Sequence, residues 1–171
     1  MVSICMEEEL SRYNLDGKWN DYVGIQKEVI SVLKEGGYFN IADIVNCETG
    51  MNIRFTAKGV KETIGKGKRF QNLPKRVKQQ KVATPRVLPL LIKEGTLRED
   101  NVKNYHEDSD DFFAYFQSRM LIDGETHDVR ISVKKKINSN HFYIHHVDTE
   151  KSPELLSPSK KTEITRFRTS N

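Results

Sequence analysis

The chain has 171 residues, of which 36% are hydrophobic and 30% charged, a composition that suits one domain with a small core and argues against a second full domain. With 28 Lys and Arg against 24 Asp and Glu, the formal charge of +4 and the sequence pI near 9.0 mildly favour polyanionic partners. Two cysteines without a CxxC pair exclude a disulfide framework and a cysteine zinc site. The sequence also lacks an apolar run of roughly 20 residues that could span a membrane and the basic-then-apolar order of a signal peptide, so we expect no membrane contact and a cytoplasmic location, in a host cell or a delivered target cell.

The first element with a clear period follows an unpatterned start. Residues 1–20 show no trustworthy period and are treated as an N-terminal extension. From residue 21 to 35, apolar side chains recur at helical spacing, Asp21 is a suitable N-cap, and Gly36-Gly37 is a suitable end. This pattern predicts a helix.

A strand and a basic segment come next. The alternating residues 51–56 predict a strand, Thr56 can cap a short helix at 57–64, and GKGKR at 65–69 predicts a loop. Nine basic residues and one acid lie between positions 58 and 81, a run that could follow a phosphate backbone or could simply be solvated. The candidate RNA contacts in this run are Lys58, Lys61, Lys66, Lys68, Arg69, Lys75 and Arg76.

The second half begins with a helix and ends with strands. Thr84-Pro85 favours the start of a helix that ends at Gly95, and the acidic residues 99–111 predict a surface loop. Asp123-Gly124 suits a type I′ turn between strands at 112–122 and 125–134, and a third strand is predicted at 141–147. We therefore predict an α+β fold in which N-terminal helices pack on a C-terminal antiparallel β-meander, as one domain over residues 21–150, followed by a disordered basic Ser/Pro tail at 151–171.

Counting outward from the turn assigns each strand residue to one of two sheet faces. The predicted core face carries Phe112, Phe116, Met120, Ile122, Val129, Ile131 and Val133, joined by Phe142 and Ile144. The predicted opposite face carries Arg119 across from Asp128, Arg130 across from Gln117, and the third-strand residues His141, Tyr143 and His145.

The opposite face holds a chemically sufficient set for cleaving RNA without a metal. Histidine can exchange protons near neutral pH, arginine donates to phosphate oxygens, and tyrosine can orient a phosphate. The competing interpretation is an ordinary solvated face in which Arg119 and Asp128 form a cross-strand ion pair. From spacing alone, this second interpretation is the more economical one.

Metal and nucleotide chemistry find little support in the sequence. With His127, the histidines His141 and His145 are the candidate metal ligands. His141 and His145 lie four residues apart on one strand, roughly 13 Å between their Cα atoms, which is too far for both to bind one ion. GKGKR is not a Walker loop. We expect no metal and no cofactor.

Three segments together resemble a known family. MNIRFTAKGVKETI at 51–64, VLPLLIKEG at 87–95 and the C-terminal meander ending in FYIHH are similar to the large polyvalent protein-associated domain 3 group, which is assigned to phage and toxin nucleases of the barnase, EndoU, colicin and RelE type. The resemblance spans about residues 20–150. It supports Tyr143 and His145 in FYIHH, with Arg130 in VRISV, although many relatives carry YD before the histidine where this chain has Tyr143-Ile144.

The resemblance implies a toxin-like, metal-independent endoribonuclease that acts on tRNA or another structured RNA through the ribose 2′-OH. In that role His145 or His141 exchanges protons, Arg119 and Arg130 hold phosphate, and Tyr143 orients it. An immunity or antitoxin protein would then be a partner, and a monomer is expected. Two alternatives stay open: a non-catalytic RNA- or protein-binding module of a phage or mobile element, and a virion-associated structural component.

Overall fold

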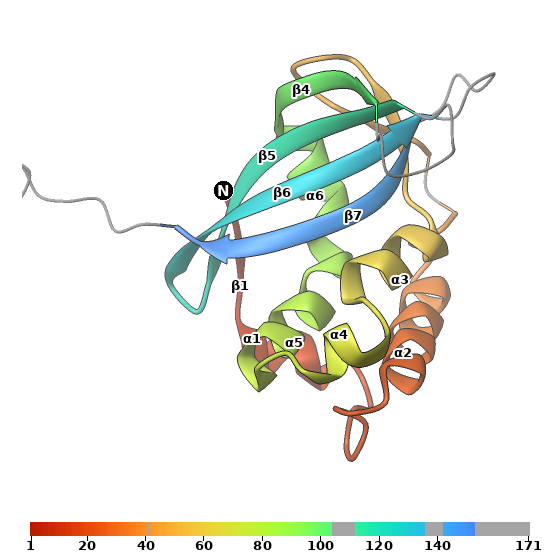
Figure 1. Ribbon diagram of the computed structural model, residues 1–171, viewed down its shortest axis with the longest axis vertical. Helices are drawn as coiled ribbons and strands as arrows, with labels where there is room; N and C mark the ends of the chain where they lie inside the picture. The colour runs from red at the N-terminus through yellow and green to blue at the C-terminus, as the bar shows by residue number, and fades with distance from the viewer. Residues whose placement is uncertain (41, 104–111, 136–141, 153–171) are drawn as a thin grey trace, which may run out of the picture.

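The structure is a computed structural model that describes residues 1–40, 42–103, 112–135 and 142–152 (Figure 1). For Lys103, residues 142–146 and Asp148 it describes the backbone but not the side chain. The predictions made for His141, for the loop at 104–111 and for the tail from 153 onward lie outside these residues.

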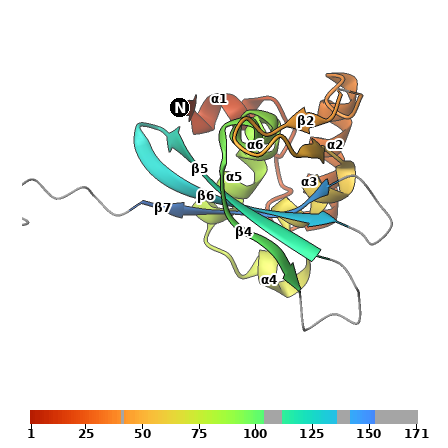
Figure 2. The same ribbon diagram turned by 90° about the horizontal axis from the view of Figure 1, so that it is seen from above.

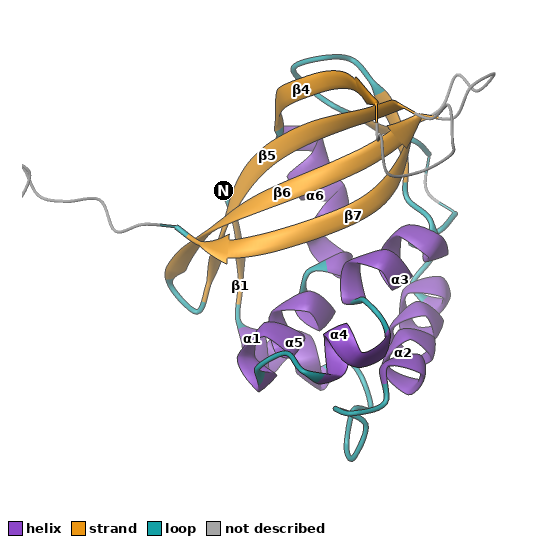
Figure 3. Cartoon of the chain, in the orientation of Figure 1, coloured by secondary structure: helices purple, strands orange, loops and turns teal. Residues whose placement is uncertain are grey.

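One mixed sheet of seven strands organises the described part of the chain (Figures 1 and 3). The strand order is β1-β5-β6-β7-β3-β2, and β4 also pairs with β5. The antiparallel meander of β5, β6 and β7 confirms the predicted fold class, whereas the parallel pairs β1 with β5 and β3 with β7 were not predicted. The strands are β1 (Val2–Ile4), β2 (Ile44–Val45), β3 (Asn52–Arg54), β4 (Thr96–Lys103), β5 (Phe112–Ile122), β6 (Glu125–Lys135) and β7 (Phe142–Lys151).

The hairpin between β5 and β6 forms as its turn residues predict. Asp123 and Gly124 adopt φ angles of 51° and 83°, so both occupy the left-handed region that a type I′ turn requires. Ile122 is the partner of Glu125, and the pairing continues without a shift to Phe112 and Lys135.

Helices cover one side of this sheet, and two of them begin at the predicted caps. Asp21 Oδ1 accepts from Gly24 N at 3.0 Å, and Thr56 Oγ1 accepts from Gly59 N at 3.1 Å. Figure 2 shows α2 and α6 on the same side of β6 and β7. The helices are α1 (Met6–Ser11), α2 (Tyr22–Glu35), α3 (Ala57–Ile64), α4 (Gly67–Gln71), α5 (Lys75–Ala83) and α6 (Leu88–Glu94), with a 3₁₀ turn at Pro85–Val87.

Several predicted boundaries need correction. Part of the supposed GKGKR loop is the start of α4, and the helix predicted from Thr84 divides into the 3₁₀ turn and α6. The supposed acidic loop begins as strand β4, because its backbone pairs with the edge of β5 whatever its surface composition. The third strand continues to Lys151, where the tail was expected to begin.

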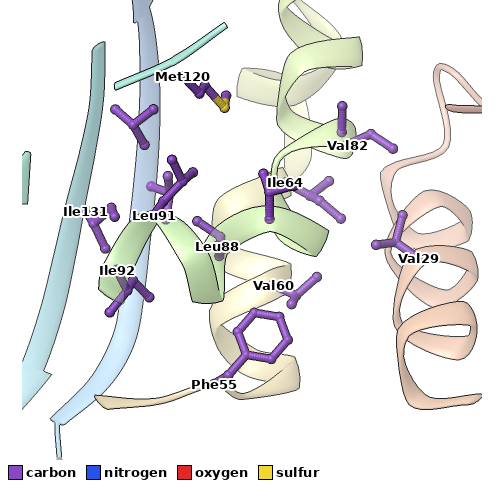
Figure 4. Packing of buried hydrophobic residues seen from close by; sticks show 14 of the residues in the cluster. Val29, Phe55, Val60, Ile64, Val82, Leu88, Leu91, Ile92, Met120 and Ile131 are labelled. Atoms are coloured by element: carbon purple, nitrogen blue, oxygen red, sulfur yellow. The ribbon is translucent and has the colours of Figure 1, made fainter. Parts of the chain in front are cut away.

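The core lies between the helices and one face of β5 and β6. Figure 4 shows Leu88, Leu91 and Ile92 of α6 close to Met120 and Ile131 of the sheet, and all five side chains are fully buried. The other predicted core residues of β5 and β6 are buried too, except Phe112, which is 38% exposed. Phe112 lies in the last pair of the β5–β6 ladder, opposite Lys135. Its neighbour Phe113 points to the other face of the sheet and is buried there.

The first twenty residues are integrated into this core. β1 pairs with the end of β5, where Val2 is the partner of Met120 and Ile4 of Ile122, and Leu15 is buried. A buried ion pair then joins α1 to the 3₁₀ turn: the carboxylate of Glu9, 3% exposed, accepts from Arg86 Nε at 2.8 Å and from Arg86 Nη2.

The ion pair has electrostatic consequences for its neighbours. The hydrogen bond to Glu9 raises the pKa of Arg86 further above its usual value. Burial, followed by the negative charge of Glu9, raises the pKa of Tyr13 to about 12. Arg12 Nε lies 3.6 Å from the same carboxylate, so Glu9 has a second, weaker partner.

Arg86→Leu should destabilise the protein markedly, because among the described residues it leaves the buried Glu9 carboxylate with only its 3.6 Å contact to Arg12. We expect the free energy of unfolding to fall by about 3 kcal/mol, measured by urea denaturation. The double variant Glu9→Leu, Arg86→Leu removes the stranded charge and should recover most of that loss. A double variant no more stable than the single one would contradict this explanation.

Candidate functional site

The β5–β6 face away from the helices, here called the outer face, carries the arginines that the sequence singled out. The register pairs Arg119 with Asp128 and Arg130 with Gln117, which confirms the predicted strand pairing. Because opposite residues of an antiparallel pair point to the same face, these four side chains share the surface opposite the core.

A groove runs over this face. The outer groove has a volume of about 670 Å³ and is lined by Arg98 from β4, Tyr115 and Gln117 from β5, and Asp128 and Arg130 from β6. The carboxylates of Glu99 and Glu150 line it as well. A second hollow of about 420 Å³, here called the adjoining hollow, contains Arg119 and shares Arg98 and Gln117 with the groove.

Arg119 is already engaged by a carboxylate. Its Nε donates to Asp128 Oδ1 at 2.8 Å, and this bond holds the pKa of Asp128 below its usual value. The cross-strand ion pair that the sequence allowed as the simpler interpretation is therefore present.

Arg98 and Arg130, in contrast, form no ion pair within the described residues. The Arg130 guanidinium lies over the ring of Tyr115, 4.5 Å from its centroid. Arg98 Nε donates to Gln117 Oε1 at 3.0 Å. Two cations from the strands on either side of β5 therefore line one groove, and each is held by a neutral side chain.

Sequence analysis missed Arg98 because no strand was predicted after Gly95 and residues 99–103 of β4 were interpreted as part of a loop. Leu97 pairs with Phe116 and Glu99 with Tyr115, so Arg98 is the extra residue of a β-bulge. A bulge redirects the side chain of its extra residue, and no local sequence signal announces it.

A second register shift affects the histidine-bearing strand. In β7, Ile144 pairs with Val133 and His146 with Ser132, which leaves His145 as the extra residue. The backbone of Tyr143 pairs with Lys134, as the regular count predicts, but the count no longer applies beyond the shift. Because the side chains of Tyr143 and His145 lie outside the described part of the structure, their predicted roles stay predictions.

His127 does not belong to the outer face. It is the partner of Met120 on the core side, its side chain is 2% exposed, and neither ring nitrogen has a hydrogen-bond partner among the described residues. Among the residues that the structure describes, no group of three or more His, Cys, Asp or Glu side chains is arranged to hold a metal ion.

The predicted basic contacts form a separate set on the helices. All seven are exposed, and they lie on α3, on α4 and the residue before it, and at the start of α5 (Figure 1). Arg76 is partly committed, since it lies 3.4 Å from Asp123 Oδ2. Lys78, from the same basic run, is buried and donates to Trp19 O and Asn20 Oδ1, so its role is structural.

The fold and the groove together define an α+β protein with an arginine-bearing sheet face. The chain matches the family described as large polyvalent protein-associated domain 3 over residues 21–144, and it belongs to that family, which is associated with polyvalent proteins of phages and mobile elements. Comparisons with curated proteins and with solved structures found no match. None of the described helices is long and apolar enough to cross a membrane.

Burial of His127 predicts a loss of stability in acid. Desolvation lowers its pKa below the ordinary 6.5, and the nearby cations Arg76 and Lys151 add to this, while Glu125 opposes it. The unfolded chain therefore takes up a proton first as pH falls through 6.5, so the stabilising effect of neutral His127 is present above that pH and is lost between it and the lower folded-state pKa.

His127→Leu should flatten this part of the stability profile. The measurement is the urea midpoint of both proteins at pH values above and below 6.5, since Leu cannot take up the proton. The difference in stability between wild type and variant should shift in favour of the variant as pH falls. Parallel profiles for the two proteins would show that another group controls the acid response.

Proposed function

We propose that the protein is a metal-independent endoribonuclease, toxin-like in character, that acts on tRNA or another structured RNA and holds its phosphates on the outer face. The observation that carries this proposal is that two arginines lining one groove, Arg98 and Arg130, form no ion pair among the residues that the structure describes. Permanently charged, forked donors of this kind match phosphate oxygens.

The chemistry would be transesterification through the ribose 2′-OH. A base removes the 2′ proton, the oxygen attacks the adjacent phosphorus, and an acid supplies a proton to the departing 5′ oxygen. Arg130 and Arg119 would stabilise the extra negative charge of the phosphorane. We assign the proton transfers to His145 or His141 and the orientation of the phosphate to Tyr143.

The strand register supports a site that extends from the groove towards β7. Glu99, Tyr115, Ser132 and His146 occupy one row across four neighbouring strands, and the extra residue His145 lies beside this row. With strands about 4.8 Å apart, the row spans about 14 Å from β4 to β7. An RNA strand crossing the sheet could contact the groove arginines and reach the histidine-bearing strand.

The helical basic surface would add attraction at longer range. Exposed lysines on α3, α4 and α5 raise the local concentration of a polyanion without fixing its position. In this proposal the protein acts in the cytoplasm of a host or target cell, as a monomer, without a cofactor, and an immunity or antitoxin protein would neutralise it.

Incubation of the purified protein with total tRNA in the presence of EDTA tests the proposal. We expect cleavage that survives chelation and falls by about 100-fold or more in His145→Ala, the usual cost of removing a general acid or base. Arg130→Ala should also abolish detectable cleavage, whereas Lys27→Ala on the exposed side of α2 should cleave normally.

The same experiment separates the second candidate function. If tRNA stays intact but is retarded in a native gel by wild type, and less so by Arg130→Ala, the protein is not a nuclease. It is then an RNA-binding module that uses the same surface. The observation that favours this alternative is that the described lining of the groove contains no imidazole. If the protein neither cleaves tRNA nor retards it in the gel, an RNA function is refuted altogether.

Asp128→Asn should tighten RNA binding if the outer face contacts phosphate. The substitution removes one negative charge from the groove and frees Arg119 from its 2.8 Å ion pair. We expect the dissociation constant for tRNA, measured by fluorescence anisotropy at fixed salt, to fall about threefold to tenfold, as for other charge changes beside bound phosphate. Unchanged affinity would place the RNA elsewhere on the protein.

A further inference from the structure

Arg98 occupies a distinctive position between two hollows. It is the extra residue at the first of two register shifts in β4, so its backbone lacks a ladder partner on β5 while its side chain reaches Gln117. The Arg98–Gln117 pair lines both the outer groove and the adjoining hollow, and therefore divides them. Each hollow contains one further arginine, Arg130 in the groove and Arg119 in the adjoining hollow.

The dividing pair presents hydrogen-bond donors to both sides. Gln117 Oε1 already accepts from Arg98 Nε, and within the described residues the Gln117 amide nitrogen has no hydrogen-bond partner. The terminal guanidinium nitrogens of Arg98 are donors only. A ligand that supplies acceptors, such as the phosphate and base oxygens along a nucleotide strand, can bind these donors.

The size of the two hollows favours single-stranded over double-stranded RNA. Volumes of about 670 Å³ and 420 Å³ lie in the range of small-ligand sites, which suits individual nucleotides. A duplex is instead recognised across a wide minor groove, over many base pairs, and its bases stay stacked inside. Unstacked bases can stack on a guanidinium plane. The exposed guanidinium of Arg130, which lies over the Tyr115 ring, is available for such stacking.

We propose that the two hollows bind successive nucleotides of a single, unpaired RNA strand, with Arg98 holding the phosphate between them. This inference rests on the proposed RNA function and adds the form of RNA that the site accepts. Loops and single-stranded ends of a structured RNA are then the segments that enter the groove, and paired stems are excluded.

The test compares binding of a short unstructured RNA with binding of the same sequence paired to its complement, by fluorescence anisotropy over a range of salt concentrations. We expect the wild type to bind the single strand about tenfold or more tightly than the duplex, consistent with stacking of at least one base. Arg98→Ala should weaken single-strand binding and lower the slope of log affinity against log salt by about 0.7, the loss of one phosphate contact.

Two further variants make the result specific. Arg98→Lys keeps the charge and should retain the salt slope, while Lys27→Ala removes a charge on α2 and should change neither slope nor preference. Thermal unfolding of each variant checks that Arg98→Ala is folded, as expected for an exposed residue of an edge strand.

The outcomes distinguish this inference from the proposed function. Equal affinity for single strand and duplex, or an Arg98→Ala variant with wild-type affinity and slope, would overturn the two-nucleotide site while leaving RNA binding intact. Failure of the wild type to bind either RNA would instead overturn the proposed function, and this inference with it.

Discussion

The unbroken ladder between β5 and β6 is the constraint on which the rest of the structure depends. Its register runs from the Asp123-Gly124 turn to Phe112 and Lys135 without a shift. Regular pairing preserves the alternation of side chains along both strands, so Phe116 and Ile131 stay in the core while Gln117 and Arg130 stay outside. A single slip would place arginines against α6 and apolar side chains in water.

The strands on either side of this ladder follow a different rule. β4 contains two register shifts and β7 contains one; Arg98 is the extra residue at the first shift of β4, and His145 is the extra residue in β7. Bulges are common at sheet edges and beside functional sites because they redirect a side chain without disturbing the neighbouring strands. The regular β5–β6 hairpin thus forms the centre of the outer face. The residues that depart from the regular alternation of side chains lie on the strands that flank it.

This division explains how much the sequence could predict. Local chemistry predicts the β5–β6 hairpin and the helix caps Asp21 and Thr56. The two-residue alternation of a strand, counted from the turn, predicts the cross-strand partners of Arg119 and Arg130. The parallel pairing of Val2 with Met120 joins residues that are far apart in the sequence, and no local pattern encodes it. Arg98 was missed because β4 has the composition of a loop, and because its bulge breaks the alternation of side chains on which counting along a strand depends.

The sequence predicts the total charge and the pairing of Arg119 with Asp128, but it does not predict the surroundings of the other cations. Three cations that look equivalent in the sequence have different surroundings: Lys78 is buried against backbone and side-chain oxygens, Arg119 is paired with Asp128, and Arg130 rests on an aromatic ring with no ion pair in the described structure. A guanidinium fixed by a neutral partner keeps its full charge and loses little entropy when it binds a phosphate.

Exposed lysines on the helices differ from the groove arginines in the same respect. Lys58 and Lys61 project from α3 as solvated charges on flexible side chains, so their attraction for a polyanion is long-ranged, screened by salt and indifferent to geometry. Arg98 and Arg130 are held within one groove and can discriminate between arrangements of phosphates. If the proposed RNA function holds, the helices should therefore govern how fast the RNA arrives, and the outer groove should govern which part of it remains bound.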